Sequence, residues 1–312
     1  MEARNIDECY GNNFSIFRGD CVKLIERLDS DSIGLNIFSP PFGGTLYTFS
    51  NDYQDFGNCV DNGQFFQQYD FLASEQYRTL KPGRLLAFHC MNIPSSKARD
   101  GFIGLSDFRG DLIRLYQKHG FIYHSEVCIF RDPVVQMQRT KALGLLHKQV
   151  KKDSAMSRQG LPDYLVVMRK PGVNDEPIKG RFDHYVGENK PHPTGDPEKD
   201  SINIWQNYAA PVWFDINQSD TLQYQSARSN NDERHITPIQ LPVVHRALQL
   251  WSNPGDTVLS PFMGIGSEGY ESLKMGRKFI GFELKESYFN CAVNNLKSVE
   301  SSDQLSLLES AS

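Results

Sequence analysis

The sequence lacks several patterns that would point to particular classes of protein. Its six cysteines form no C-x-x-C pair and no cysteine–histidine spacing typical of zinc, which argues against a disulfide framework and a zinc site. It has no run of about 18 apolar residues and no basic-then-apolar N-terminus, so we expect neither a membrane span nor a secretory signal. These absences predict a cytoplasmic protein without a bound metal.

The chain also lacks an internal repeat, and its 312 residues suit one large α/β domain with insertions or two small domains. The net charge of −5 disfavours a nucleic-acid partner, but residues 131–170 carry nine Lys and Arg against three Asp. A solvated face and a phosphate-binding surface explain this excess equally well. Its candidate phosphate contacts are Arg139, Lys141, Lys148, Lys151, Lys152 and Arg158.

Residues 256–284 predict a strand, a glycine turn, a helix and a second strand. The strand Thr257–Ser260 leads into a G-x-G-x-x-G spacing that begins at Gly264, and a helix follows over Ser267–Met275. The second strand ends near Glu283, and an acid about 20 residues past such glycines suits the hydroxyls of a ribose. The pattern predicts a nucleoside-cofactor pocket, with a tight turn that binds no ligand as the alternative.

A second strand end carries the tetrapeptide Ser39-Pro40-Pro41-Phe42. The preceding Ile33–Phe38 is almost wholly apolar, as in the centre of a parallel sheet. The two prolines end this strand and hold the backbone extended. A polar residue, two prolines and an aromatic at the tip of a buried strand suit a planar group that carries an amino group. A simple Pro-Pro turn is the alternative.

The remaining segments alternate between strand and helix patterns. Further strands are predicted at Phe14–Arg18, Arg84–His89, Phe121–Phe130 and Asp163–Arg169. Helices are predicted after Asp20, over Gln64–Leu80, over Asp107–His119, from Thr237 with Pro238 in its first turn, and from Leu284 to about Leu296. Irregular segments are predicted at Lys81–Gly83, at Asn92–Gly104 and at 171–231, where we expect Trp205 and Trp213 to pin long loops. A short helix over Thr140–Gln149 would expose cations.

These motifs resemble those of the amino-methyltransferases that act on DNA bases with S-adenosylmethionine. Ser39–Phe42 matches the family's catalytic tetrapeptide, (Ser, Asn or Asp)-Pro-Pro-(Tyr or Phe), and Pro261-Phe262-x-Gly264-x-Gly266 matches its cofactor motif. The tetrapeptide comes first, in the permuted order called beta, as in phage and bacterial members. The resemblance implies a Rossmann-like methyltransferase fold, an α/β architecture with a mainly parallel sheet, an antiparallel hairpin and inserted target-recognition loops.

The resemblance also implies roles for individual residues. S-adenosylmethionine would be bound by Asp20, Pro238, Ser260, Phe262, Gly264, Gly266, Ser267 and Glu283. Asp20 would lie beside the adenine, although it could equally cap the helix that follows it. Ser260 stands where the family commonly has Asp, which puts one contact with the methionine amino group in doubt.

The implied organisation has six parts. They are a catalytic half at 1–130, a basic insert at 131–162 as candidate for target recognition, a core strand at 163–170, a loop-rich insert at 171–234, a cofactor-binding half at 235–296 and a disordered tail at 297–312.

The implied reaction is methyl transfer to the exocyclic amine of a base flipped out of duplex DNA. Ser39 and the Pro40 carbonyl would accept hydrogen bonds from the amine, with Pro41 keeping the turn rigid and Phe42 stacking on the base. Serine at the first tetrapeptide position favours cytosine N4, with adenine N6 second. No Pro-Cys pair is present to supply the thiolate of a cytosine carbon-5 enzyme.

Other functions remain open at this point. A non-catalytic DNA-binding protein of the same fold, an enzyme acting on RNA or protein, and a nicotinamide oxidoreductase each share some of these motifs. A monomer and a homodimer are both open, since many members of the group are dimers. No nuclease or helicase motif is present, so any restriction partner would be a separate chain.

Overall fold

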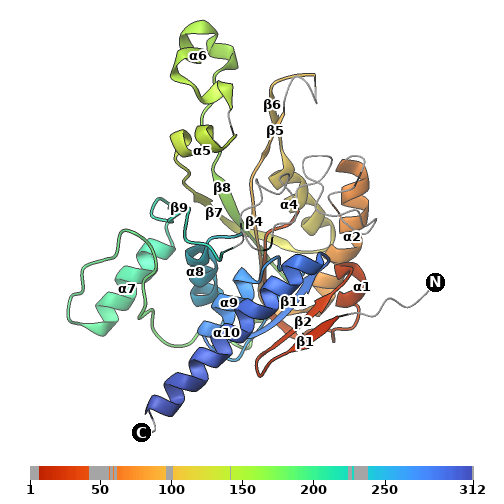
Figure 1. Ribbon diagram of the computed structural model, residues 1–312, viewed down its shortest axis with the longest axis vertical. Helices are drawn as coiled ribbons and strands as arrows, with labels where there is room; N and C mark the ends of the chain where they lie inside the picture. Colours follow the sequence, from red (N-terminus) through yellow and green to blue (C-terminus); the bar gives the residue numbers. More distant parts are fainter. Residues whose placement is uncertain are drawn as a thin grey trace.

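A nine-stranded sheet runs through the centre of the molecule, with helices on both faces (Figure 1). The computed structural model describes residues 7–41, 56, 59, 62–95, 101–140, 142–223, 227 and 238–310. The strands are β1 (Glu8–Tyr10), β2 (Phe14–Arg18), β3 (Ile33–Phe38), β4 (Leu80–Cys90), β7 (Ile122–Ile129), β8 (Asp163–Arg169), β9 (Val212–Trp213), β10 (Thr257–Ser260) and β11 (Lys278–Glu283).

The strand order is β1-β2-β11-β10-β3-β4-β8-β7-β9. From β2 to β4 every neighbouring pair is parallel, whereas β8 pairs antiparallel with both β4 and β7. All six residues of β3 are buried, because both faces of the central strands are covered by helices. The predicted fold class, mainly parallel with an antiparallel hairpin, is confirmed.

Three helices contribute to the apolar core on each face of the sheet. On one face they are α1 (Cys21–Ile25), α2 (Asn62–Thr79) and α4 (Phe108–Lys118). On the other they are α8 (Leu241–Trp251), α9 (Ser267–Lys274) and α10 (Glu286–Ser310). No helix in the described part of the chain is long and apolar enough to span a membrane.

Helix α8 begins later than the sequence predicts. Gln240 is extended (φ −66°, ψ 132°) and is the N-cap, so Pro242, not Pro238, lies in the first turn. The backbone N–H of Leu241 donates to the carbonyl of Asp220, which holds the approach to the helix in this extended path. The predicted start at Thr237 and Pro238 is therefore wrong, and Thr237 itself lies outside the described residues.

Helix α10 continues to Ser310, so the expectation of a disordered tail from 297 is wrong for residues 297–310. Val299 is buried in the same core as Leu296, and the Glu300 carboxylate accepts a hydrogen bond of 3.0 Å from the backbone of Asn13. The polar composition of this segment gave no sign of these contacts, which hold α10 against the core past Leu296.

Three segments predicted to be irregular contain regular structure. Lys81–Gly83 lies within β4, where the N–H of Gly83 donates to the carbonyl of Lys170 (3.1 Å). The segment Asn92–Gly104 contains β5 (Ile93–Ser95), which pairs with β6 (Gly104–Ser106) in a two-stranded ribbon.

The third segment, 171–231, contains helix α7 (Pro197–Tyr208). Of the two tryptophans expected to pin it, Trp213 is buried and donates its indole N–H to the carbonyl of Tyr208 (3.1 Å). Trp205 is 48% exposed, so the expectation for that residue is wrong.

Residues 131–162 form an arm that projects from the sheet (Figure 1). It contains α5 (Pro133–Thr140), α6 (His147–Lys152) and the 3₁₀ turns η2 (Leu143–Leu145) and η3 (Ser154–Met156), in place of one helix over Thr140–Gln149. The side chain of Gln136 closes its base, because its amide donates to the carbonyl of Leu161 (2.8 Å) and accepts from the N–H of the same residue (3.0 Å).

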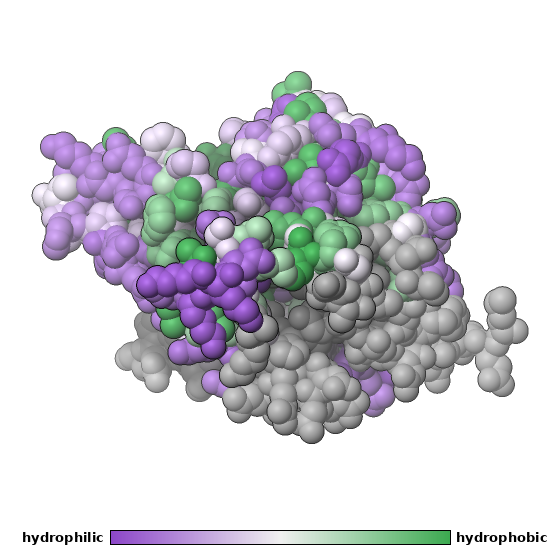
Figure 2. Space-filling model, turned by 90° about the horizontal axis from the view of Figure 1, so that it is seen from above, coloured by the Kyte–Doolittle hydropathy of each residue, from purple (hydrophilic) through white to green (hydrophobic). Residues whose placement is uncertain are grey.

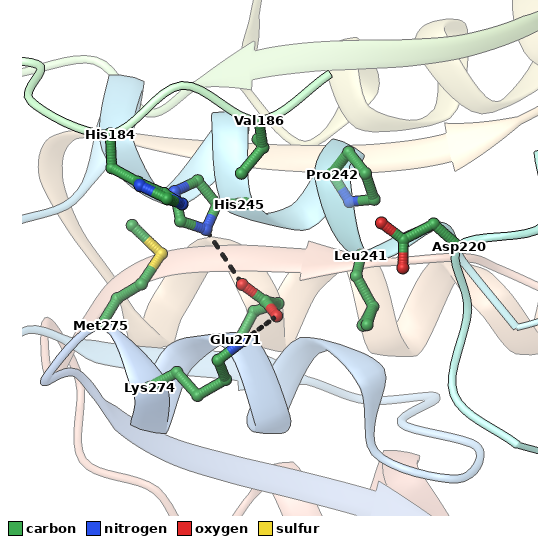
Figure 3. Close-up of a pocket in the computed structure, with 9 residues that line it drawn as sticks. All are labelled: His184, Val186, Asp220, Leu241, Pro242, His245, Glu271, Lys274 and Met275. Carbon is green, nitrogen blue, oxygen red and sulfur yellow. Dashed lines mark hydrogen bonds and ion pairs between the residues drawn. The ribbon is translucent and has the colours of Figure 1, made fainter. Parts of the chain in front are cut away.

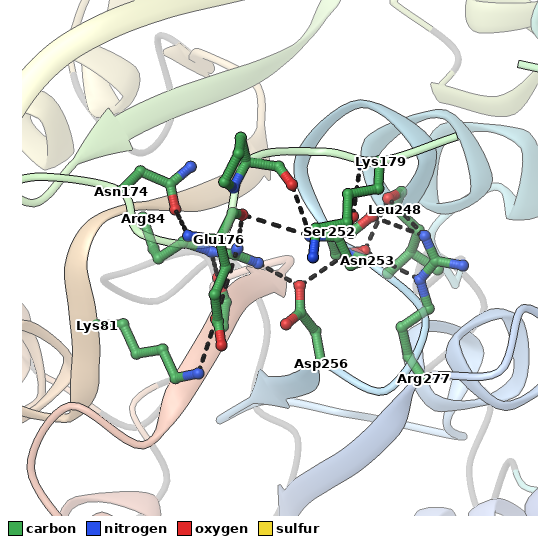
Figure 4. Close-up of polar contacts among 12 residues, drawn as sticks. Lys81, Arg84, Asn174, Glu176, Lys179, Leu248, Ser252, Asn253, Asp256 and Arg277 are labelled. Carbon is green, nitrogen blue, oxygen red and sulfur yellow. Dashed lines mark hydrogen bonds and ion pairs between the residues drawn. The ribbon is translucent and has the colours of Figure 1, made fainter. Parts of the chain in front are cut away.

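A buried ion pair joins Arg84 of β4 to Asp256, the residue before β10 (Figure 4). The side chains of Arg84 and Asp256 are 3% and 8% exposed. Arg84 also donates to the carbonyls of Gly34 and Glu176, each at 2.8 Å, and Asp256 accepts from the N–H of Asn253 at 2.7 Å. Four chain segments are thus held by one guanidinium and one carboxylate.

We expect Asp256→Asn to lower the free energy of unfolding by about 3 kcal/mol, because it removes the buried counter-ion of Arg84 and leaves only the more distant, half-exposed Glu176 carboxylate at 3.9 Å. Denaturant titration measures this decrease. The matched control is Asp111→Asn, whose partner Arg114 is 61% exposed, and its effect should be much smaller. Equal effects in the two variants would contradict this assignment.

Candidate active site

The ends of five parallel strands meet at one edge of the sheet, here called the carboxyl edge. The N–H of Gly19, just after β2, donates to the carbonyl of Glu283 at the end of β11 (2.9 Å). The N–H of Met263, just after β10, donates to the carbonyl of Phe282 (3.0 Å). These two bonds bring the Gly19 turn, the glycine turn and Glu283 together.

Among the described residues, the glycine turn is open at one position and closely packed at the others. Gly264 and Gly266 have φ of +54° and +89°, which favour glycine. A Cβ at Gly264 would meet no atom of the described residues within 4 Å, whereas one at Gly269 would lie 2.6 Å from the ring of Phe279. A ligand can therefore approach the backbone at Gly264, while Gly269 lets α9 pack against β11.

Two buried hydroxyls flank this turn. Ser260 ends β10 and Ser267 begins α9, and both side chains are buried. Neither hydroxyl has a hydrogen-bond partner among the described residues. Since buried polar groups are normally hydrogen-bonded, this pair fits the polar groups of a ligand bound at Gly264.

Two predicted cofactor acids lie on either side of the Gly19 contact. Asp20 is the N-cap of α1, where its carboxylate accepts from the N–H of Val22 (3.0 Å). The carboxylate of Glu283 accepts from the N–H of Lys285 (2.8 Å). The capping role of Asp20 is confirmed, while the contacts of both acids with a cofactor stay predictions.

Glu268 is a third acid at the turn, and it was not among the predicted site residues. Burial raises the pKa of its carboxyl to about 8, and the negative charge of Glu283 adds to the shift. The residue is only 3% exposed. An acid in the first turn of a helix usually faces solvent, so no local pattern indicated that this one turns inward.

Ser39 lies at the carboxyl edge beside the glycine turn. Leu259 of β10 stands opposite Asn36 of β3, so the residues that follow the two strands are neighbours. The Ser39 hydroxyl donates to the carbonyl of His89 at 3.0 Å. Pro40 is buried and Pro41 half-buried, whereas Phe42 lies outside the described residues.

Two further predicted cofactor residues have different surroundings. The ring of Phe262 packs among core aromatics, stacked on Tyr69 at 6.0 Å and edge-on to Phe56 at 5.6 Å. Pro238 is half-buried and lies three residues before α8. Contact of either residue with a cofactor remains a prediction.

A histidine and an acid behind Ser39 were also absent from the predicted site. His89 Nδ1 lies 3.4 Å from Ser39 Oγ, and His89 Nε2 lies 3.5 Å from Asp163 Oδ2. Arg131 donates to Asp163 Oδ1 at 2.9 Å. Burial alone would raise the pKa of Asp163, but the adjacent His89 and Arg131 side chains hold it below its usual range.

The arm 131–162 projects from the same edge. β7 is parallel to β4, because both are antiparallel to β8, so the arm after β7 and the ribbon β5–β6 after β4 rise together (Figure 1). Figure 2 looks down on them and shows hydrophilic lobes with apolar side chains gathered between.

The predicted cations of the arm differ in their surroundings. Lys148, Lys151 and Lys152 are exposed on α6. Arg158 is half-buried and donates to the carbonyl of Gln159 (3.0 Å), and burial lowers the pKa of its guanidinium. The Arg139 side chain and all of Lys141 lie outside the described residues.

A separate pocket of about 330 Å³ lies between α8 and α9 (Figure 3). Inside it His245 Nδ1 lies 3.0 Å from a Glu271 carboxylate oxygen, and Lys274 contacts the other oxygen at 3.3 Å. None of the predicted site residues lines this pocket. Across the described ranges no cluster of three His, Cys, Asp or Glu side chains could hold a metal.

Comparison with known proteins gives a consistent set of matches. A family described as DNA methylase matches residues 33–294. The chain is 24% identical over 324 aligned residues to the type II methyltransferase M.BglI of Bacillus subtilis, covering 91% of this chain and 85% of that one.

Two solved structures share the fold. A candidate DNA modification methylase of Thermus thermophilus, crystallised with S-adenosyl-L-methionine, has a TM-score of 0.65 at 19% identity, with 93% of this chain and 94% of that chain covered. The PvuII DNA methyltransferase, described as cytosine-N4-specific, has a TM-score of 0.62 at 17% identity, with 93% and 91% covered.

The raised pKa of Glu268 predicts that stability falls with pH. The folded state keeps the proton up to about pH 8, whereas the unfolded state loses it near the ordinary value of 4.5, so the unfolding free energy decreases between these values. The limiting slope is about 1.4 kcal/mol per pH unit. We expect Glu268→Gln to remove this slope in denaturant titrations at about pH 5, 6, 7 and 8.

The control is Glu198→Gln on α7, which replaces a carboxylate that is 71% exposed and should leave the slope unchanged. A Glu268→Gln protein with the same pH dependence as the unmodified chain would show that Glu268 is ionised throughout.

Proposed function

Because this chain belongs to the DNA methylase family, we propose that it transfers a methyl group from S-adenosylmethionine to the exocyclic amine of a DNA base. The observation that carries the proposal is the meeting of Ser39 with the glycine turn at the carboxyl edge. A site for an amine acceptor thereby adjoins a site for a nucleoside cofactor.

The residues at the glycine turn fit this cofactor. Backbone at Gly264 is open to a ligand, and the unpartnered hydroxyls of Ser260 and Ser267 in the described part of the chain can bond its polar groups. Glu283 would accept from the ribose hydroxyls, and Asp20 would lie near the adenine. When bound, S-adenosylmethionine supplies an electrophilic methyl carbon.

Ser39 would make the amine nucleophilic. The nitrogen lone pair of an exocyclic amine is delocalised into the ring, and acceptors for its two protons favour the tetrahedral form that can attack. The Ser39 proton is directed to the His89 carbonyl, which leaves the oxygen lone pairs available to accept from the base. The carbonyl of Pro40 would be the second acceptor, so positioning and electrostatics supply most of the acceleration.

Cytosine N4 is the favoured target and adenine N6 the second. Serine at the first tetrapeptide position supports cytosine, and the PvuII enzyme of the same fold carries a cytosine-N4 description. The base would leave the duplex, since its amine is not accessible within the stack.

Duplex DNA would lie along the carboxyl edge beside the arm. Three exposed lysines on α6 support this proposal, since duplex binding depends on neutralising phosphates. Lys148, Lys151 and Lys152 would contact the backbone, and the rest of the arm 131–162 would read the target sequence.

The first experiment incubates the protein with mixed-sequence duplex DNA and methyl-labelled S-adenosylmethionine and identifies labelled nucleosides by mass spectrometry. We expect N4-methylcytosine, and a decrease of about 10²-fold or more in rate for Ser39→Ala, which removes one acceptor. Ser298→Ala is the control, because its hydroxyl also donates to a backbone carbonyl, at 2.7 Å, but on α10.

N6-methyladenine would assign adenine instead. Label in RNA or protein but not in DNA would contradict the DNA substrate. Cofactor binding without transfer to any of the three would leave the non-catalytic DNA-binding alternative.

The arm makes a separate prediction. Replacing Lys148, Lys151 and Lys152 by Ala should weaken duplex binding equally for all sequences and reduce the slope of log K against log salt by about 0.9 for each phosphate that is no longer neutralised. Fluorescence anisotropy between low and moderate salt measures both effects. The matched control replaces three exposed lysines off the arm, namely Lys190, Lys278 and Lys297. An unchanged slope in the arm variant would contradict phosphate binding by α6.

A further inference from the structure

Ser39 belongs to a chain of polar groups that continues into the protein. We propose that His89, held in place by Asp163, positions the Ser39 hydroxyl and receives the proton that the target amine releases during methyl transfer. The inference rests on the proposed function, and it assigns a role to two residues outside the family motifs quoted above.

The geometry places the imidazole between the serine and a buried carboxylate. His89 lies near the end of β4, its side chain is 13% exposed, and its Nδ1 faces Ser39 Oγ at 3.4 Å. Its Nε2 faces Asp163 Oδ2 at 3.5 Å, and no hydrogen bond to that nitrogen exists among the described residues. The ring is therefore next to the catalytic edge with both nitrogens aimed at oxygen atoms.

The contacts of the Asp163 carboxylate keep it ionised. Asp163 is 3% exposed, and Arg131 donates to its other oxygen at 2.9 Å. An ionised carboxylate can only accept, so the proton of a neutral His89 belongs on Nε2, facing Asp163. In this tautomer the lone pair of Nδ1 is directed at Ser39, so Nδ1 can accept a proton.

The transfer step balances with these groups. The amine nitrogen uses its lone pair to form the new bond to the methyl carbon, and the electron pair of the broken carbon–sulfur bond stays on sulfur. Before reaction the Ser39 hydroxyl donates to the His89 carbonyl, and it turns to His89 Nδ1 as transfer begins. The nitrogen passes one proton to Ser39 Oγ, and Ser39 passes its own hydroxyl proton to His89 Nδ1. The product side then holds a neutral methylated amine and an imidazolium beside the Asp163 carboxylate, and the ring later releases its proton to solvent.

The test compares His89→Gln with the unmodified protein in single-turnover methyl transfer at a series of pH values, with the Kd for S-adenosylmethionine and for duplex DNA measured separately. We expect His89→Gln to react about 10²-fold or more slowly, with both Kd values within about 3-fold of the unmodified protein. The pH profile of the rate should differ between the unmodified protein and the variant, because only the former has an imidazole beside Ser39. The groups that face His89 are Ser39 just after β3, Asp163 from β8 and, behind Asp163, Arg131 at the start of the arm.

The matched control is His119→Gln. His119 also contacts a carboxylate, Asp70, at 2.7 Å and is 17% exposed, but it follows α4 at the opposite edge of the sheet. The His119→Gln protein should have the same rate and pH profile as the unmodified protein. Asp163→Asn is the second variant and keeps the imidazole, and we expect it to react about 10-fold more slowly because the Nε2 proton is no longer held.

A His89→Gln protein as fast as the unmodified protein, with the same pH profile, would overturn the inference. So would a variant whose slower reaction is fully explained by weaker cofactor or DNA binding, since that is the behaviour of a purely structural residue. No transfer by the unmodified protein would instead refute the proposed function, and the two failures are thus distinct.

Discussion

The parallel pairing of β3 with β10 is the contact on which the site depends. Val258 stands opposite Leu35 and Leu259 opposite Asn36, and this register joins two distant parts of the chain. Both strands are mostly apolar and almost wholly buried, so a slip of one residue would turn each packed side chain to the other face and is strongly disfavoured. The amine site and the cofactor site are at one edge because this register is fixed.

The features predicted from the sequence are those with local causes. Positive φ at Gly264 and Gly266 favours glycine, two consecutive prolines end a strand, and a buried central strand such as β3 is mostly apolar. The fold class and the glycine turn could therefore be predicted from the sequence. Asp20 shows the limit of such local prediction. Its capping hydrogen bond could be predicted from the neighbouring residues, whereas a contact with a ligand could not.

The features that the sequence could not show depend on distant contacts. His89 and Asp163 are far apart in the chain and meet only because β8 pairs antiparallel with β4. Glu268 looks like an ordinary first-turn acid until the packing of α9 buries it. The continuation of α10 past Leu296 likewise involves Val299, which is buried in the core beneath the helix.

The Arg131–Asp163 contact has a consequence for how this chain can vary. The two residues flank nearly the whole arm, and their side chains pair at 2.9 Å, so the insertion leaves and re-enters the sheet at almost one point. The entropic cost of closing a loop rises only slowly with the length of the loop. An arm of different size or sequence could therefore be accommodated between these ends with little loss of stability. The arm can thus change in length and sequence during evolution, while the strands beneath it keep their register.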